Sequence, residues 1–474
     1  MTNNAFTLGY TSLDKEVRLD SLPVEGTIPT WLTGSLSRNG PAKFEVGAET
    51  FKHWFDGFAM LHRFSFQNGN VSYENKFLQS ETYKVSMQEG HIAFSQFATD
   101  PCKAAFKGMM TESVNANVTI NKVAGEYVAM TGTPLPIAFD PHTLETLGVV
   151  HYDDALVGHH GSAHPHYDFA NKMSVSYMTE FYMPSVFKVY SIKDGEHSRK
   201  MIGSYQVMEP AYLHSFGMTE HYIVIAEYPY RVNPMEMVQS GKPFIENYTW
   251  RPQDPTKFLV MSKADGSIVG QYEVEAFFAF HHINAFECDG QVIVDISTYP
   301  DASSIHSLYL DQIRNATVSQ QPSELQNETR RYYLPLSGDK KAQYELLSAY
   351  GIELPTLNYR RYSARDYGVA YGIGLDKQRQ GAFTNLLLRV DVNTHTTTIW
   401  SEKHCYPGEP IFAEAPNPKA EDDGVILSVV LNADKGNSFL LVLDAHTFEE
   451  IGRAEVPHHI PCGFHGEWFN SIQE

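Results

Sequence analysis

The chain has 474 residues, of which 42% are hydrophobic, 13% aromatic and 19% charged, so it can bury a large core and is not expected to be disordered. The formal net charge is -20 and no run of Lys and Arg forms a basic stripe, which argues against nucleic acid and against attachment to anionic lipid by charge alone. The N-terminus has no basic segment followed by an apolar one, and nowhere do about 18 apolar residues run unbroken. We therefore expect a soluble protein with neither a signal peptide nor a membrane span.

A hairpin pattern recurs along the chain: a strand-like run, a polar turn and a second strand-like run. It occurs at 63–77, 137–150, 188–207, 258–274, 387–400 and 439–456, with turn residues such as Asn68-Gly69 and Asp265-Gly266. The turn centres are about 72, 54, 71, 128 and 52 residues apart, so one hairpin is missed in the fourth step. A period of about 63 residues repeated seven times predicts an all-β, seven-bladed β-propeller.

No linker or shift in composition divides the chain, so we expect residues 1–474 to form one domain rather than several unrelated β domains. Helix is scarce, and its best candidates are 103–113 and 233–242. These segments are too short to form a separate domain, so loops and a few short helices are expected to cap the propeller.

The four cysteines lie far apart and form no C-x-x-C pair; they are Cys102, Cys288, Cys405 and Cys462. Neither a disulfide framework nor a zinc ribbon is indicated. A reducing compartment fits this pattern, and we expect a cytoplasmic location.

Histidine is unusually frequent, with 21 residues, and four of them stand at Gly- or aromatic-flanked positions beside strand-like runs: His164, His214, His281 and His465. Their separations of about 50, 67 and 184 residues approximate one, one and three blade repeats, so they can converge on the propeller axis. A site built only of imidazoles suits Fe(II), Cu, Ni or Zn. Four imidazoles leave two positions of an octahedron open, whereas a closed tetrahedral zinc site is the alternative that spacing does not separate.

Several longer motifs occur in order: LTGSLSRNGPAKFEVG, HWFDGFAMLHRFSF, ELPTLNYRRY, GEPIF, AEDDGVILSVVL and VPHHIPCGFHGEWF. Together with the four histidine segments they make the chain resemble the carotenoid cleavage oxygenase family nearly end to end. The resemblance implies a seven-bladed propeller with an axial Fe(II) centre and an apolar tunnel. It assigns the four ligands to His164, His214, His281 and His465.

In the family, glutamates accept hydrogen bonds from the metal-bound imidazoles. By resemblance Glu353 supports His281 and Glu409 supports His465. A third glutamate is expected after Thr131, to support His214, but the chain has Gly132 there. Water, another carboxylate, a loosely held His214 and an engineered substitution are the alternatives.

The activity that the resemblance implies is non-haem Fe(II) dioxygenase cleavage of a C=C bond in a carotenoid or apocarotenoid. The partners are then an apolar polyene and O2, and the products are two carbonyl compounds such as retinal or apocarotenals. Alternatives are a stilbenoid-cleaving branch, in which a lysine stands where this chain has Thr131, and a propeller that binds an apocarotenoid or a metal without turnover. Retinyl-ester isomerisation is a more distant alternative.

One apolar segment is a candidate contact with a membrane surface: Cys102, Phe106, Met109 and Met110. Because the family's substrates reside in membranes, a monotopic patch at the tunnel mouth is favoured over a buried segment, at the inner membrane surface.

Overall fold

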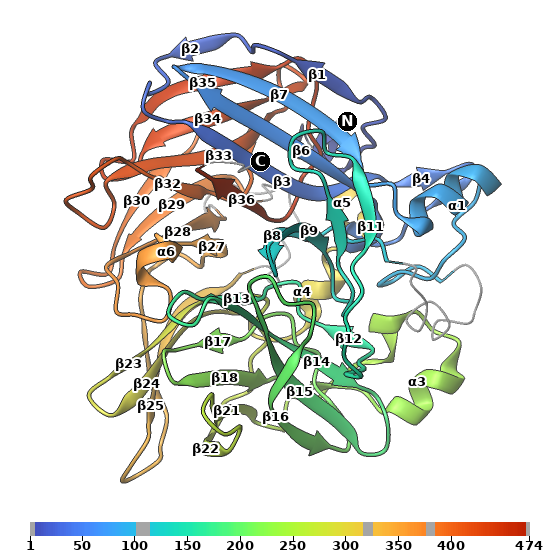
Figure 1. Ribbon diagram of the computed structural model, residues 1–474, viewed down its shortest axis with the longest axis vertical. Coiled ribbons are helices and arrows are strands. Elements are labelled where there is room, and N and C mark those ends of the chain that lie inside the picture. The colour runs from blue at the N-terminus through green and yellow to red at the C-terminus, as the bar shows by residue number, and fades with distance from the viewer. Residues whose placement is uncertain (1–4, 101–113, 316–325, 376–383, 471–474) are drawn as a thin grey trace.

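Seven antiparallel sheets follow one another and close into a ring in this computed structural model, which describes residues 5–100, 114–315, 326–375 and 384–470 (Figure 1). Each sheet is one blade. The predicted seven-bladed β-propeller is therefore confirmed.

The blades are made of the following strands, with the innermost strand or strand pair first. The blade after the closing blade contains β8 (Thr119–Val123), β9 (Glu126–Met130), β10 (Ile137–Phe139) and β11 (Thr146–Val149). The second contains β12 (His160–Gly161), β13 (His166–Asp168), β14 (Met173–Glu180), β15 (Ser185–Lys193) and β16 (Lys200–Val207). The third contains β17 (Gly217–Met218), β18 (Tyr222–Glu227), β21 (Thr256–Ser262) and β22 (Ile268–Val274).

The next two blades contain β23 (His282–Cys288), β24 (Gln291–Thr298), β25 (Glu328–Pro335) and β26 (Gln343–Leu346); and β27 (Glu353–Thr356), β28 (Val369–Gly374), β29 (Leu386–Asp391) and β30 (Thr396–Trp400). A sixth sheet has β31 (Cys405–Pro407), β32 (Ile411–Glu414), β33 (Gly424–Asn432), β34 (Asn437–Asp444), β35 (Glu450–Val456) and β2 (Val24–Gly26). The closing blade has β36 (Gly466–Phe469), β3 (Gly34–Lys43), β6 (Phe58–Gln67), β7 (Asn70–Phe77) and β1 (Val17–Leu19). Two small pairs, β4 (Glu45–Val46) with β5 (Glu49–Thr50) and β19 (Tyr230–Arg231) with β20 (Thr249–Trp250), lie outside the blades.

All six predicted hairpins are present as neighbouring strands of one blade. The β6–β7 turn shows the local cause: Asn68 and Gly69 have φ of 51° and 80°, which these two residue types adopt at low cost in a two-residue hairpin turn. The missed hairpin is β25–β26, in the long fourth step as expected. Three of the four residues of β26 are exposed, so that strand carries no apolar alternation to detect.

The ring is closed by strands from both ends of the chain. β36 pairs with β3, with Ser35 opposite Phe469, and β2 pairs with β35, with Val24 opposite Ala454. In Figure 1 the blue N-terminal strands accordingly lie beside the red C-terminal ones. This closure joins the two ends of the chain into one ring of blades.

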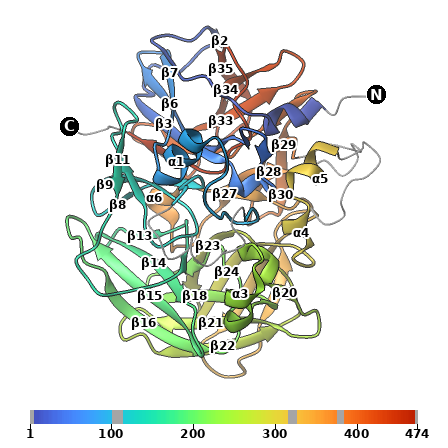
Figure 2. The ribbon, with the colours of Figure 1, turned by 90° about the vertical axis from the view of Figure 1, so that its right-hand side faces the viewer.

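Short helices stand outside the blades: α1 (Glu81–Glu89), α3 (Pro234–Ser240), α4 (Ser303–His306), α5 (Leu310–Asn315), α6 (Tyr359–Tyr362), and the 3-10 turns Ala5–Tyr10, Trp54–Asp56 and Phe244–Asn247. α1 and α3 lie at the right in Figure 1 and face the viewer in Figure 2. The predicted helix at 233–242 is confirmed as α3, which begins after the Asn233 cap and ends at Gly241 in the left-handed conformation. The other predicted helix, 103–113, lies outside the described residues. Among the described helices, none has the length and apolarity needed to cross a membrane.

The innermost strands bring the motif residues to the centre of the ring. In Figure 1, β8, β13, β17, β27 and β36 surround the middle of the molecule. Every predicted ligand histidine lies beside an innermost strand, because a blade begins at the axis and its later strands step outward.

Candidate metal centre

The four predicted histidines meet at one point on the axis. The structure brings together His164, His214, His281 and His465, with one nitrogen from each within 4.8 Å of all the others. Nε2 of His164 lies 3.0 Å from Nε2 of His214, and Nε2 of His281 lies 3.2 Å from Nε2 of His465. Two nitrogens bound at right angles to one ion, with bonds of about 2.1 Å, lie about 3.0 Å apart, so the spacing fits a shared ion.

Burial keeps three of these imidazoles in the form that binds metals. The pKa values of His164, His214 and His465 lie well below the ordinary value, first because burial disfavours the charged ring and second because neighbouring histidines repel a further proton. A neutral imidazole offers a lone pair to a cation. The donor set therefore fits a divalent transition metal held by nitrogen alone.

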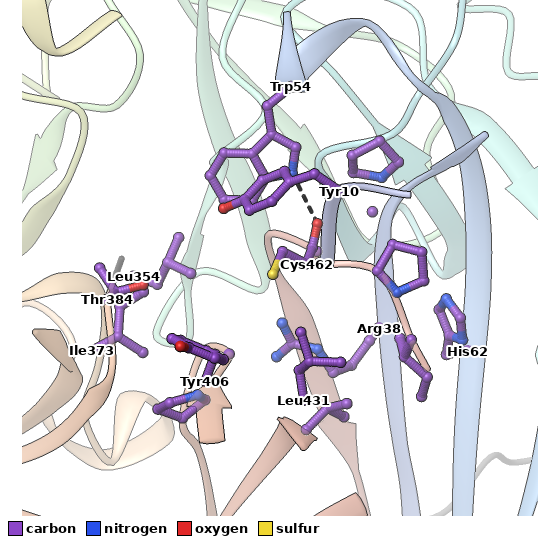
Figure 3. Close-up of a pocket in the computed structure, with 18 of the residues that line it drawn as sticks. Tyr10, Arg38, Trp54, His62, Leu354, Ile373, Thr384, Tyr406, Leu431 and Cys462 are labelled. Carbon is purple, nitrogen blue, oxygen red and sulfur yellow. Dashed lines mark hydrogen bonds between the residues drawn. The ribbon is translucent and has the colours of Figure 1, made fainter. Parts of the chain in front are cut away.

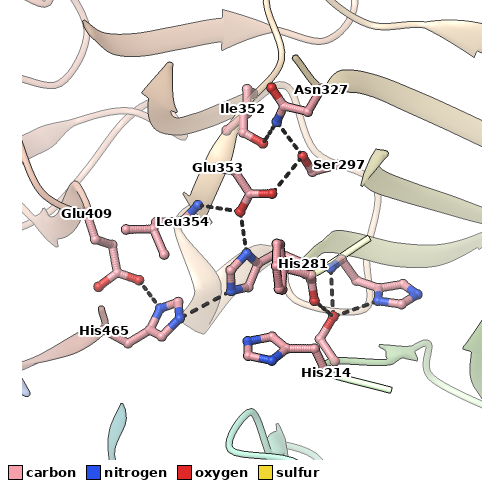
Figure 4. Close-up of polar contacts among 12 residues, drawn as sticks. His214, His281, Ser297, Asn327, Ile352, Glu353, Leu354, Glu409 and His465 are labelled. Carbon is pink, nitrogen blue, oxygen red and sulfur yellow. Dashed lines mark hydrogen bonds and ion pairs between the residues drawn. The ribbon is translucent and has the colours of Figure 1, made fainter. Parts of the chain in front are cut away.

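Two of the rings are held from outside by the predicted glutamates (Figure 4). Nδ1 of His281 lies 2.5 Å from Oε2 of Glu353, and Nδ1 of His465 lies 2.7 Å from Oε1 of Glu409. Ser297 donates to Oε1 of Glu353 at 3.2 Å. A ring that uses Nε2 for a metal carries its proton on Nδ1, so each glutamate can accept that proton's hydrogen bond and fix the ring direction.

Glu409 is itself fixed by an arginine that the sequence reasoning did not single out. Nη1 of Arg38 lies 3.3 Å from Oε2 of Glu409, and the backbone N–H of Gly466 donates to the same oxygen at 2.8 Å. Burial raises the pKa of Glu409 to about 7, against the opposing effect of Arg38. Arg38 lies in the SLSRNGP motif on β3 and is buried with the residues around it. A basic residue within such a strand is the signal that could have found it.

Thr131 and Gly132 do not supply a partner to His214. Thr131 donates to Oδ1 of Asn117 at 3.4 Å. A Cβ built on Gly132 would meet Cε1 of His160 at 2.9 Å, closer than real contacts allow. The place where the resemblance expects a glutamate is therefore beside the imidazole of His160.

A different side chain reaches the outer nitrogen of His214. The hydroxyl of Tyr212 lies 3.3 Å from its Nδ1. Sequence reasoning missed Tyr212, although AYLHSF places it two residues before the histidine and alternate residues of an extended segment point the same way. That spacing is the signal that could have found it.

Three cavities that adjoin through shared wall residues extend from the histidines. The one of about 80 Å³ beside His214, His281 and His465 is mainly apolar, with walls such as Phe280 and Phe464. It shares Trp54, Leu354, Ile373 and Thr384 with a cavity of about 50 Å³ near Tyr10 and Cys462, shown in Figure 3.

On the other side, Phe55, Val118 and His214 separate the apolar cavity from a third cavity of about 110 Å³, which is lined partly by Thr131, Gly132 and His160. A larger cavity of about 710 Å³, with both polar and apolar walls, reaches His164, His281 and His465 along the axis. The histidines thus stand between three mainly apolar neighbouring cavities and a larger axial space with mixed walls.

The proposed membrane patch of Cys102, Phe106, Met109 and Met110 lies outside the described residues. Membrane contact through it stays a prediction.

Comparison with known proteins agrees with this geometry. The family model described as retinal pigment epithelial membrane protein matches residues 10–470. The chain is 36% identical to the mitochondrial carotenoid-cleaving dioxygenase of Mustela putorius furo, over 96% of this chain and 95% of that protein. It is 32% identical to the beta,beta-carotene 15,15'-dioxygenase of Gallus gallus, over 94% of each. A solved mutant of the Synechocystis apocarotenoid oxygenase superposes with a TM-score of 0.89, at 25% identity and over 99% of both chains.

A propeller of seven blades with four axial histidines is the architecture of an oxygenase family. This chain belongs to the carotenoid cleavage oxygenase family, as its motifs indicated.

The expected cytoplasmic location is contradicted. The carotenoid-cleaving dioxygenases of Mustela putorius furo, Macaca fascicularis and Homo sapiens, which are 35–36% identical to this chain, are named as mitochondrial proteins. The expectation rested on cysteine spacing and on the absence of a leader pattern, and neither feature separates reducing compartments from one another.

Proposed function

We propose that this protein is a non-haem Fe(II) dioxygenase that cleaves a C=C bond of a carotenoid or apocarotenoid. One oxygen atom of O2 goes to each of the two carbonyl products. The observation that carries the proposal is the convergence of four imidazoles beside an apolar cavity. The names of the similar proteins, which include carotenoid-cleaving dioxygenases, support it.

The chain's own residues hold and orient the centre. His164, His214, His281 and His465 would bind Fe(II) through Nε2, while Glu353 and Glu409 fix two of the rings through Nδ1. When bound, Fe(II) supplies the redox chemistry that lets ground-state O2 react with a closed-shell alkene. With no carboxylate or thiolate among the four ligands, the metal would be bound by imidazole alone, a donor set that suits Fe(II) among the first-row metals.

The cavity walls position the polyene and exclude water. Phe280, Phe464 and Trp54 place flat apolar surfaces beside the histidines, which suits a rigid conjugated chain. The cavities on either side adjoin the central one through shared wall residues. Movement of those side chains would let a linear substrate lie across the centre with one double bond near the histidines. No side chain is required as a general acid or base.

A second candidate, cleavage of a stilbenoid alkene, is favoured by one observation. The cavity on the Gly132 side includes amide and hydroxyl side chains, among them Asn115, Asn117 and Thr131, and such groups can bind a phenol. The apolar character of the central cavity favours the polyene.

The test is anaerobic loading with Fe(II), followed by O2 and a panel of β-carotene, apocarotenals and resveratrol, with products identified by mass. Paired carbonyl fragments from a carotenoid or apocarotenal are expected. Cleavage of resveratrol alone selects the second candidate. Binding of the substrates without O2 uptake identifies a propeller without turnover and overturns the proposal.

A further inference from the structure

His214 has an outer partner of a different chemical kind from those of His281 and His465. We propose that Tyr212 is the positioning residue for His214, and that its neutral hydroxyl takes the role of the missing glutamate. The inference rests on the proposed function, since it requires His214 to bind the metal through Nε2. Nδ1 of His214 then carries a proton and donates to the Tyr212 hydroxyl, 3.3 Å away.

Tyr212 is held firmly enough to orient a ring. Its side chain is buried, at 3% exposure, and its backbone N–H donates to the carbonyl of Tyr230 at 2.9 Å. The rings of Tyr248 and Phe278 pack against it, with centroids 5.8 and 6.2 Å away. A buried aromatic ring packed on two sides has one position for its hydroxyl.

His160 belongs to the same packed group and explains why position 132 is a glycine. Nε2 of His160 lies 3.2 Å from the carbonyl oxygen of Leu213, and its ring packs between Tyr212 and Phe244, with centroids 5.7 and 5.2 Å away. A side chain at Gly132 would meet this ring at 2.9 Å. A glutamate there must therefore displace His160 before it can approach His214, and displacing His160 disturbs Tyr212.

A tyrosine hydroxyl in place of a glutamate carboxylate changes the electrostatics of the metal centre. A phenol is neutral at physiological pH, whereas Glu353 can accept with a full negative charge. Charge-assisted hydrogen bonds are roughly twice as strong as neutral ones, so the His214 ring is less polarised than the His281 ring. His214 is then directed by geometry more than by charge, and the centre has one carboxylate fewer than the family pattern.

Tyr212→Phe tests the role by removing one oxygen atom, and Tyr248→Phe is the matched control. The Tyr248 hydroxyl is also buried and has no hydrogen-bond partner among the residues that the structure describes, so its removal should change neither measurement below. Fe(II) affinity is measured anaerobically by competition with a chelator, and ligand geometry is read from the visible spectrum of Co(II)-loaded protein. We expect Tyr212→Phe to weaken Fe(II) binding about 10-fold, the lower end for such partners, and to alter the Co(II) spectrum.

Gly132→Glu provides a second, independent test of the role of Tyr212. We expect it to lower Fe(II) affinity, because it displaces His160 and Tyr212. Unchanged affinity and spectrum in a folded Tyr212→Phe, or tighter binding in Gly132→Glu, overturns the role of Tyr212. His214→Ala separates the failure of this inference from the failure of the proposed function. If His214→Ala abolishes Fe(II) binding while Tyr212→Phe has no effect, only the role of Tyr212 is wrong. If the His214→Ala variant binds Fe(II) normally, the metal centre itself is wrong.

Discussion

Glu409 connects His465 to Arg38. One carboxylate oxygen lies 2.7 Å from Nδ1 of the histidine, and the other lies 3.3 Å from Nη1 of the arginine. The imidazole direction is therefore set by a group on another blade, which is held in turn by β3 of the closing blade. This arrangement couples closure of the ring to the geometry of the centre.

Replacing Glu409 should affect iron and stability differently according to the replacement. Glu409→Gln keeps the shape and removes the charge, so Fe(II) affinity should fall about 10–100-fold. Glu409→Ala should in addition destabilise the metal-free protein by about 3–5 kcal/mol, because it leaves buried Arg38 with neither a charge partner nor a side-chain acceptor at this position. Chelator competition and urea unfolding measure the two effects. Glu414→Gln on β32, which contacts Asn358 and Arg361, is the control and should leave iron binding unchanged.

Ile373 should control the length of substrate that the cavities accept, since it lines both the central cavity and the one near Cys462. Ile373→Trp should lower kcat/KM for β-carotene at least 10-fold more than for a short apocarotenal, with iron content unchanged. Ile373→Val is the control and should affect both substrates alike. An equal loss for long and short substrates in the Trp variant would show that a polyene does not cross this junction.

His62 should make the protein less stable in mild acid. Burial lowers its pKa to about 3, so between pH 6.5 and 4.5 the unfolded chain binds a proton that the folded chain does not. The stability contribution is present above the unfolded pKa and is lost as pH falls toward the folded one. For one such group the loss over this interval is about 2 kcal/mol.

The check is urea unfolding of metal-free protein across that interval. His62→Gln should reduce the fall in unfolding free energy, whereas the exposed His142→Gln should not. Identical pH dependence in both variants would contradict the assignment.

The fold could be predicted because a propeller repeats a local signal. Turn pairs such as Asn68-Gly69 recur once per blade, so a missed hairpin still left a gap of the right size. β26 escaped detection because its residues are mostly exposed, and α1 because its short polar segment has no apolar periodicity. Ring closure by β2 and β36 depends on pairing between the two ends of the chain, which no local pattern reports.

The candidate site could be predicted in part. His164 and Glu353 stand in motifs long enough to be matched to a family. In the structure His164 lies in the cluster of four histidines and Glu353 lies beside His281. His160 could not be found that way, because its role depends on which side chains meet across blades. The signal for Tyr212, its place two residues before His214, was present in the sequence. The glycine at position 132 marked the place of the missing glutamate, but only the structure shows that the imidazole of His160 lies there.

Iron stoichiometry in the histidine variants tests the central claim most directly. The unchanged chain should bind one Fe(II) and consume O2 with an apocarotenoid, and replacement by Ala of any of His164, His214, His281 and His465 should abolish both. His282→Gln, adjacent in sequence but outside the cluster of four, should retain the metal. Full iron occupancy and turnover in any one of the four alanine variants would contradict a shared four-histidine iron centre.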